Sequence, residues 1–174
     1  MNEAEFWDIV ETTRIQSGDS IDKQGKLLGE ALGQLEPEKI ISFFHIYCYL
    51  HNWAYRAELC AAAILINGGC SDDGFSDFRD WLILQGKEKY YQAIDDPDTL
   101  IAIALFGKAW SVLYSTIRTA YERKTGTRQI PYPDLDDVEE LPEIDGSKLE
   151  PTVAMQLFPK LGAKSREVYD WEDL

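Results

Sequence analysis

Basic residues are scarce in this chain. It has 17 lysines and arginines against 31 aspartates and glutamates, which gives a net charge of −14 over 174 residues. A surface of this charge repels phosphate backbones and anionic lipid headgroups. The few basic residues do not cluster along the sequence. The composition therefore argues against direct binding to nucleic acid or to a membrane, and it favours a basic protein as partner.

Long apolar runs are also missing. The longest apolar-rich stretch, Ile40–Ile66, is interrupted by polar and charged residues, which are His45, His51, Asn52, Arg56 and Glu58. A membrane span needs about 20 largely apolar residues, so this stretch predicts a buried helix. Residues 1–5 are acidic and do not lead from a basic segment into an apolar run. We therefore expect no signal peptide.

Cysteine and histidine are few as well. The three cysteines, Cys48, Cys60 and Cys70, lack short Cys-x-x-Cys spacing, which favours a reducing compartment such as the cytoplasm. His45 and His51 belong to no HExxH signature or Ser-His-Asp order, and no glycine-rich phosphate cradle is present. We expect neither a metal nor a cofactor. Cys48 and His51 are predicted to be core residues, with His51 hydrogen-bonded to Tyr47 or Tyr55 at helical spacing.

What the chain does contain is a helical apolar period along most of its length, with 45% hydrophobic residues. This predicts an all-α fold, a single compact domain over residues 1–174 with about seven helices. The expected helical segments are one that ends at about Gln16, one from Asp19 or Ser20 to about Leu35, Pro37–Asn67, Asp77–Ile83, Tyr90–Ile94, Thr99–Leu105, Lys108–Lys124 and Val153–Phe158. Trp110 is expected on the inner face of its helix.

The composition changes over residues 127–148. Three prolines alternate there with a series of carboxylates, a mixture that builds no core element. We predict a long acidic, Pro-containing loop at 127–148 and a short C-terminal tail at 159–174. Long connections without regular structure in compact domains tend to be functional or mobile. The candidate partner-binding residues are Asp134, Asp136, Asp137, Glu139, Glu140 and Trp171.

The most informative stretch is the turn at 69–75 and the helix after it. The candidate ligand-binding residues are Cys70, Ser71, Asp72, Asp73, Arg79 and Trp81. One interpretation is structural: a side chain at 71–73 caps the helix that follows, and Arg79 bridges back to Asp73. A second makes Asp72 and Asp73 metal ligands or acid and base groups, helped by Glu58 or Asp80. Adjacent side chains usually point apart, and the spacing of a calcium loop is missing.

A third interpretation makes Cys70 a nucleophile, because the dipole of the next helix stabilises a thiolate at its amino end. The two aspartates that follow oppose this effect. Nothing in the sequence places either histidine beside Cys70, so the sequence offers no base for the thiol.

The order of these residues resembles a bacterial family, domain of unknown function 4240. The resemblance rests on Phe6-Trp7, Ala54-Tyr55, Gly69-Cys70-Ser71-Asp72-Asp73-Gly74-Phe75, Phe78-Arg79-Asp80-Trp81-Leu82-Ile83, Gln85-Gly86, Asp96-Pro97-Asp98 and Phe158-Pro159-Lys160-Leu161. Where the family has a second tryptophan after the tyrosine, this chain has Arg56-Ala57-Glu58-Leu59-Cys60. The resemblance implies a fold and a motif and no activity.

The sequence leaves three functions from different classes open, one of which is a structural adaptor for a larger regulatory complex. The first is an acidic, cytoplasmic, protein-binding module, inhibitory or of the immunity-protein type, which engages a basic partner through its acidic loop and tail. The alternative is a small-ligand or metal-dependent enzyme or sensor, with a site between Gly69 and Arg79.

Overall fold

The computed structural model describes every residue except 19, 112, 134–143, 145–149 and 172–174. All regular structure in the described residues is helical, which confirms the all-α prediction. The described part contains ten helices, more than the seven or so expected. They are α1 (Glu3–Ser17), α2 (Ile21–Gly33), α3 (Pro37–Trp53), α4 (Ala57–Asn67), α5 (Asp72–Leu84), α6 (Lys87–Asp95), the 3₁₀-helix η1 (Pro97–Ala102), α7 (Leu113–Thr125), α8 (Pro151–Leu157) and α9 (Pro159–Val168).

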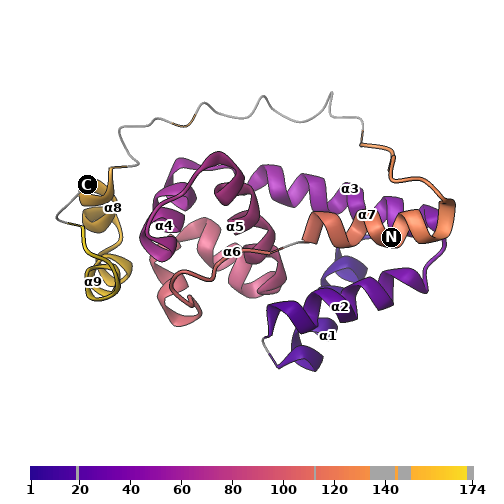
Figure 1. The fold of residues 1–174 in the computed structure, drawn as a ribbon, viewed down its shortest axis with the longest axis horizontal. Helices are drawn as coiled ribbons and strands as arrows, with labels where there is room; N and C mark the ends of the chain where they lie inside the picture. The colour runs from indigo at the N-terminus through magenta and orange to yellow at the C-terminus, as the bar shows by residue number, and fades with distance from the viewer. Residues whose placement is uncertain (19, 112, 134–143, 145–149, 172–174) are drawn as a thin grey trace.

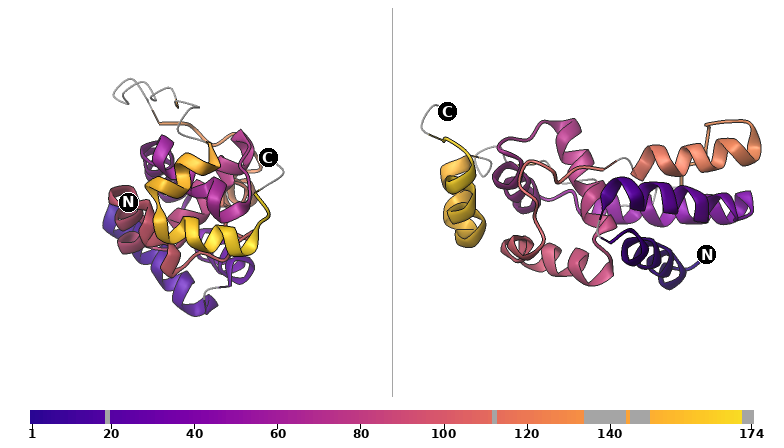
Figure 2. Two further views of the ribbon diagram at one scale, coloured as in Figure 1. Left: turned by 90° about the vertical axis from the view of Figure 1, so that its left-hand side faces the viewer. Right: turned by 60° about the horizontal axis from the view of Figure 1, so that its bottom comes forward.

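The helices form an elongated arrangement with two unlike ends (Figure 1). Helices α1, α2, α3 and α7 make one end, and α7 packs along α2 and α3. Helices α8 and α9 form a pair at the other end, and both contact α4 (Figure 2). The core between them is aromatic, with the fully buried side chains of Phe6, Phe43, Phe78 and Tyr90. The C-terminal pair is therefore joined to the rest of the fold mainly through α4 and η1.

The two ends of α1 are fixed by capping residues next to it in the sequence. Asn2 and Glu5 form a reciprocal capping box at the start of α1, in which each side chain accepts the other residue's backbone N–H. Gly18 ends the helix in the left-handed region, with a φ of 63°. The predicted end at about Gln16 is confirmed to within one residue.

The long helix predicted over Pro37–Asn67 is wrong, because the chain breaks between Trp53 and Ala57. Arg56 is extended, with a φ of −133° and a ψ of 141°. Its side chain turns back and donates from Nε to the Trp53 carbonyl at 3.1 Å, and its guanidinium lies 4.7 Å from the centroid of the Trp53 ring. The break turns α4 away from α3 without a proline or glycine to mark it.

Two other boundaries differ from the prediction. Helix α5 begins at Asp72, five residues before the expected Asp77, because Ser71 caps it. Helix α7 begins at Leu113 instead of Lys108. The segment before it is held in an irregular path by Asn67, whose side-chain amide exchanges two hydrogen bonds with the backbone of Ala109. Trp110 is consequently 51% exposed and does not face the core as expected.

The predicted tail at 159–174 is largely helical, because α9 occupies Pro159–Val168. Helix α9 buries only one large apolar side chain, Leu161, together with the small residues Gly162 and Ser165. A Cβ at Gly162 would lie 2.8 Å from the Met155 Cα, so the glycine permits the close approach of α8 and α9. Ser165 Oγ donates to the Leu65 carbonyl at 2.8 Å and ties α9 to α4. Helix α9 is thus held to the fold by polar contacts and by close packing at small residues, and it lacks the stripe of apolar side chains by which a helix is usually recognised in a sequence.

Candidate functional site

The turn before α5 is a helix cap with exposed carboxylates. Ser71 Oγ accepts the backbone N–H of Gly74 at 3.1 Å, which satisfies one of the free donors of the first helical turn. Asp72 and Asp73 lie in that first turn and are both exposed. Their charge is favourable there because it faces the positive end of the helix dipole.

Arg79 is buried and engaged with the backbone instead of with Asp73. It donates from Nε to the Phe75 carbonyl at 3.3 Å and from Nη1 to the His51 carbonyl at 3.0 Å. Its guanidinium lies 5.0 Å from the centroid of the Tyr55 ring and 4.9 Å from that of Phe75. Arg79 therefore fastens α5 to the end of α3.

Behind the turn, Asp80 is the centre of a buried polar cluster. Asp80 Oδ1 accepts the Tyr47 hydroxyl at 2.8 Å, and Oδ2 accepts the backbone N–H of Tyr114 at 3.0 Å. Burial raises the pKa of Asp80 to about 6, against which these two hydrogen bonds act. The same burial, with Asp80 beside it, raises the pKa of Tyr47. The carboxylate joins α3 and α5 to the start of α7.

His51 lies next to this cluster. Its Nε2 is 3.7 Å from Asp80 Oδ1, 3.3 Å from the Ser76 carbonyl and 3.4 Å from Ser76 Oγ. Burial and the nearby Arg79 lower the pKa of His51 to about 3. A Ser-His-Asp relay needs one ring nitrogen for the serine and the other for the carboxylate. Here one nitrogen faces both, so the three residues do not form such a relay.

These contacts correct the prediction that His51 is hydrogen-bonded to Tyr47 or Tyr55. Its ring packs on that of Tyr47, with centroids 5.3 Å apart, and its hydrogen bonds go to Ser76. Trp81 is 3% exposed and belongs to the core, where it packs on Phe78. Within the described ranges, no group of three or more histidine, cysteine or acidic side chains is placed to hold a metal ion.

The described structure leaves all three cysteines as free thiols. Cys70 is partly exposed on the turn, where its thiol donates to the Ser71 carbonyl at 3.6 Å, and Cys60 is buried on α4. Neither histidine hydrogen-bonds to Cys70.

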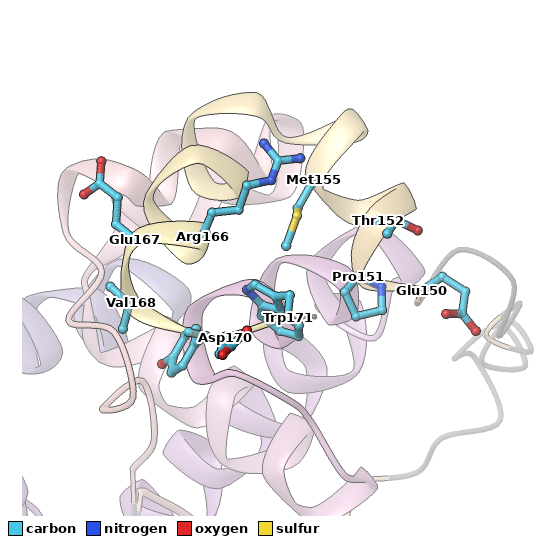
Figure 3. Close-up of a pocket in the computed structure, with 10 residues that line it drawn as sticks. Glu150, Pro151, Thr152, Met155, Arg166, Glu167, Val168, Asp170 and Trp171 are labelled. Carbon is cyan, nitrogen blue, oxygen red and sulfur yellow. The ribbon is translucent and has the colours of Figure 1, made fainter. Parts of the chain in front are cut away.

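A second candidate site is a groove at the C-terminal end of the molecule, with a volume of about 680 Å³. It lies between the start of α8 and the end of α9 with the segment that follows. Trp171 lies in its middle, with Pro151 and Met155 of α8 on one side and Val168 on the other (Figure 3). The groove is also lined by four charged residues, which are Glu150, Arg166, Glu167 and Asp170.

The aromatic floor of this groove is fixed by hydrogen bonds. Trp171 donates from its indole nitrogen to the Ser165 carbonyl at 3.3 Å and to Ser165 Oγ at 3.1 Å. Tyr169 donates its hydroxyl to the Ile66 carbonyl at 2.7 Å. The two rings meet edge to face, with centroids 5.8 Å apart. Trp171, a predicted partner-binding residue, is therefore a half-buried, oriented side chain. The other five candidates, at positions 134–140, lie outside the described residues.

A family model described as "Protein of unknown function (DUF4240)" matches residues 1–123. The chain belongs to the DUF4240 family. The DUF4240 segment runs from α1 into α7 and carries the capped turn, Arg79 and the Asp80 cluster. The groove and the acidic stretch lie outside it. No curated protein and no solved structure matches the chain.

The matched segment holds the start of α9 through Asp98. Asp98 is 6% exposed, and its carboxylate accepts the backbone N–H groups of Lys160 and Leu161, the first turn of α9. The Phe158–Leu161 run lies beyond the matched residues, yet it is held by Asp98, which lies inside them. None of the helices in the described part is both long and apolar enough for a membrane span.

Proposed function

We propose that the protein is an acidic binding module for a basic protein partner, and that the groove around Trp171 receives a basic segment of that partner. One observation carries the proposal. Three carboxylates and a single guanidinium line a groove whose floor is a pair of fixed aromatic rings. Tryptophan and tyrosine with a charged rim are the typical anchors of protein interfaces.

The chain's charge supports a basic occupant. The net charge is −14, and Glu150, the last carboxylate of the acidic stretch in the sequence, lines the groove. A negative field speeds the encounter with a positive partner and repels nucleic acid. An immunity protein that blocks a toxin would use such a surface. The cytoplasmic location remains part of this proposal and rests on the pattern of the cysteines.

The aromatic floor supports a lysine or arginine side chain in particular. Cations are attracted to the faces of tryptophan and tyrosine rings, by about 0.5–2 kcal/mol depending on exposure. Trp171 and Tyr169 line the groove together with Glu150 and Asp170, so the side chain of a basic residue can meet both an aromatic ring and a carboxylate there. The apolar stem of that side chain packs against Met155 and Val168.

The proposal is tested with peptides selected from a random display library on the full-length protein. We expect the selected peptides to carry lysine or arginine next to an apolar residue. Their affinity should fall with salt, and the double variant Glu150→Gln and Asp170→Asn should weaken binding by about threefold to tenfold. Asp95→Asn, on the exposed face of α6, is the matched control and should leave affinity unchanged. Selection of acidic peptides, or equal affinity in the groove variant, would refute the proposal.

The alternative function, a ligand or metal site between Gly69 and Arg79, has less support. The Arg79 guanidinium donates hydrogen bonds to two backbone carbonyls, and Trp81 lies in the core. Neither side chain is therefore available to a ligand at the turn. Thermal shift separates the two functions. A metal ion or metabolite that raises the melting temperature of the wild type but not of Asp73→Ala would favour the alternative.

A further inference from the structure

We propose that the groove around Trp171 binds the C-terminal end of a partner chain whose last residue is lysine or arginine, and that Arg166 sets this specificity by pairing with the terminal carboxylate. The inference rests on the proposed function and goes beyond it, because it states which part of a basic partner is bound. It is carried by two charges of opposite sign, on Arg166 and Glu150, that line the same groove.

Arg166 supplies the positive charge of the groove. It lies in the last turn of α9 and is exposed, and its side chain extends from α9 in the direction of Met155 (Figure 3). Within the described ranges, its guanidinium takes part in no hydrogen bond or ion pair. The neighbouring Glu167 is paired instead with Lys164, at 2.7 Å. The Arg166 guanidinium is therefore available to a ligand.

Glu150 supplies a negative charge that is also available. It is the N-cap of α8, yet its side chain accepts no backbone N–H of the first helical turn. Its carboxylate is exposed and has no ion pair with any residue that the structure describes. The groove therefore offers its occupant one carboxylate and one guanidinium that this chain leaves without a counter-charge.

A C-terminal basic residue matches both charges. A purely basic segment would satisfy Glu150 but would place a like charge beside Arg166, which lowers affinity. A terminal lysine or arginine carries a cationic side chain for Glu150 and the Trp171 ring, and an α-carboxylate for Arg166. A guanidinium binds a carboxylate through two parallel N–H···O bonds. The capture of a chain end is a recurring mode of peptide recognition.

The size of the groove also favours a chain end. Its volume of about 680 Å³ lies in the range of about 300–1,000 Å³ that is typical of sites for one small ligand. This space suits the last few residues of a chain. An internal segment would need an added acidic side chain to pair with Arg166, and that side chain would reduce the positive charge that attracts the segment to this acidic protein.

The test uses two synthetic peptides of one sequence, selected from a library with free C-termini and ending in an apolar residue followed by lysine. One has a free C-terminal carboxylate and the other is amidated. Amidation makes the peptide more positive, so the net charge of −14 alone would strengthen its binding. We expect the opposite, because amidation removes the partner of Arg166: affinity for the full-length protein should fall by about threefold to tenfold.

Variants assign this preference to Arg166. Arg166→Gln should bind the two peptides equally. Arg123→Gln, which removes an exposed arginine of α7, is the matched control for net charge and should keep the preference for the free carboxylate. Both variants should keep the melting temperature of the wild type, since both side chains are exposed.

The outcomes separate this inference from the proposed function. Equal or tighter binding of the amidated peptide by the wild type would overturn the chain-end assignment and leave the groove as a site for internal basic segments. A third peptide, amidated and with aspartate beside the lysine, tests a side-chain source of the carboxylate. If it binds as tightly as the free acid, the assignment is wrong. Binding of neither lysine peptide would overturn the inference and the proposed function together.

Discussion

Asp98 of η1 and Leu161 of α9 are joined by a hydrogen bond of 2.9 Å, from the Leu161 backbone N–H to Asp98 Oδ1, across 63 residues of chain. The other carboxylate oxygen accepts the N–H of Lys160 at 3.2 Å. A carboxylate in this place satisfies donors that have no partner within the helix and faces the positive end of its dipole. The DUF4240 segment thus holds the first turn of the helix that carries the groove.

Replacing this carboxylate should loosen the C-terminal pair. We predict that Asp98→Ala lowers the free energy of unfolding by about 1–3 kcal/mol, since two backbone donors, of which that of Leu161 is buried, lose their acceptor. Urea denaturation measures the change. Asp95→Ala, at an exposed position on the neighbouring helix, serves as the control and should stay within about 0.5 kcal/mol of the wild type. An equal free energy of unfolding for the two variants would show that Asp98 does not stabilise the start of α9.

Gly68 should tolerate no side chain. Its φ is 73°, and an added Cβ would lie 2.7 Å from Cε1 of the Tyr169 ring, which lines the groove. We predict that Gly68→Ala costs about 1–3 kcal/mol, from the left-handed backbone and the displaced ring together. Gly33→Ala is the control, because no atom approaches that position within 4 Å. It should be neutral or stabilising, and thermal unfolding of the two variants measures the difference.

His51 should make the protein sensitive to acid. Burial and Arg79 lower the pKa of His51 to about 3, whereas an unfolded histidine titrates near 6.5. Between these values the unfolded chain binds a proton that the folded protein does not. The stability from neutral His51 is therefore complete above about pH 6.5 and is lost as the pH falls.

His51→Gln should remove this dependence. The difference in unfolding free energy between wild type and variant should shrink by about 3 kcal/mol from pH 6.5 to pH 4. Denaturation at several pH values gives the difference. A constant difference over this range would mean that the imidazole is not shielded as the structure places it.

Asp80 should act with the opposite sign in an overlapping window. Burial raises its pKa from 3.8 to about 6, so the folded protein keeps a proton that the unfolded chain has lost. Its stabilising contribution is present below about pH 4 and is lost as the pH rises to about 6. Asp80→Asn should therefore gain about 2–3 kcal/mol relative to the wild type across this range. NMR titration of the Asp80 carboxyl provides the direct check, and an ordinary pKa would contradict the prediction.

Helix boundaries that depend on residues close in the chain could be predicted from the sequence. The Ser71 cap and the end of α1 follow from side chains within one helical turn of the boundary. The break at Arg56 could not be foreseen, because its cause is a side chain folded back on Trp53 and not a proline or glycine. Helix α9 escaped prediction because Asp98 and Leu65, far away in the chain, supply the contacts that hold it.

The candidate sites likewise contain features that the sequence pattern shows and features that only the packing of the helices creates. The turn at 70–73 and Trp171 are candidates that the sequence pattern singles out, and their roles stay predictions. The Asp80 cluster depends on how α3, α5 and α7 pack, and the groove depends on how α8 and α9 pack. The local periodicity of the sequence carries no information on this packing. Glycine and serine on α9 could have served as a signal, since small residues mark close helix contacts.

A basic segment of the partner is proposed to dock in the groove around Trp171. The most direct measurement is a titration of the isotope-labelled protein with a selected basic peptide, followed by NMR. We predict shifts confined to the groove, at the Trp171 indole and at the backbone of Glu150, Met155 and Asp170, that weaken with salt. Shifts centred instead on the turn from Cys70 to Asp73, with the Trp171 indole unmoved, would contradict the account and place the site at the helix cap.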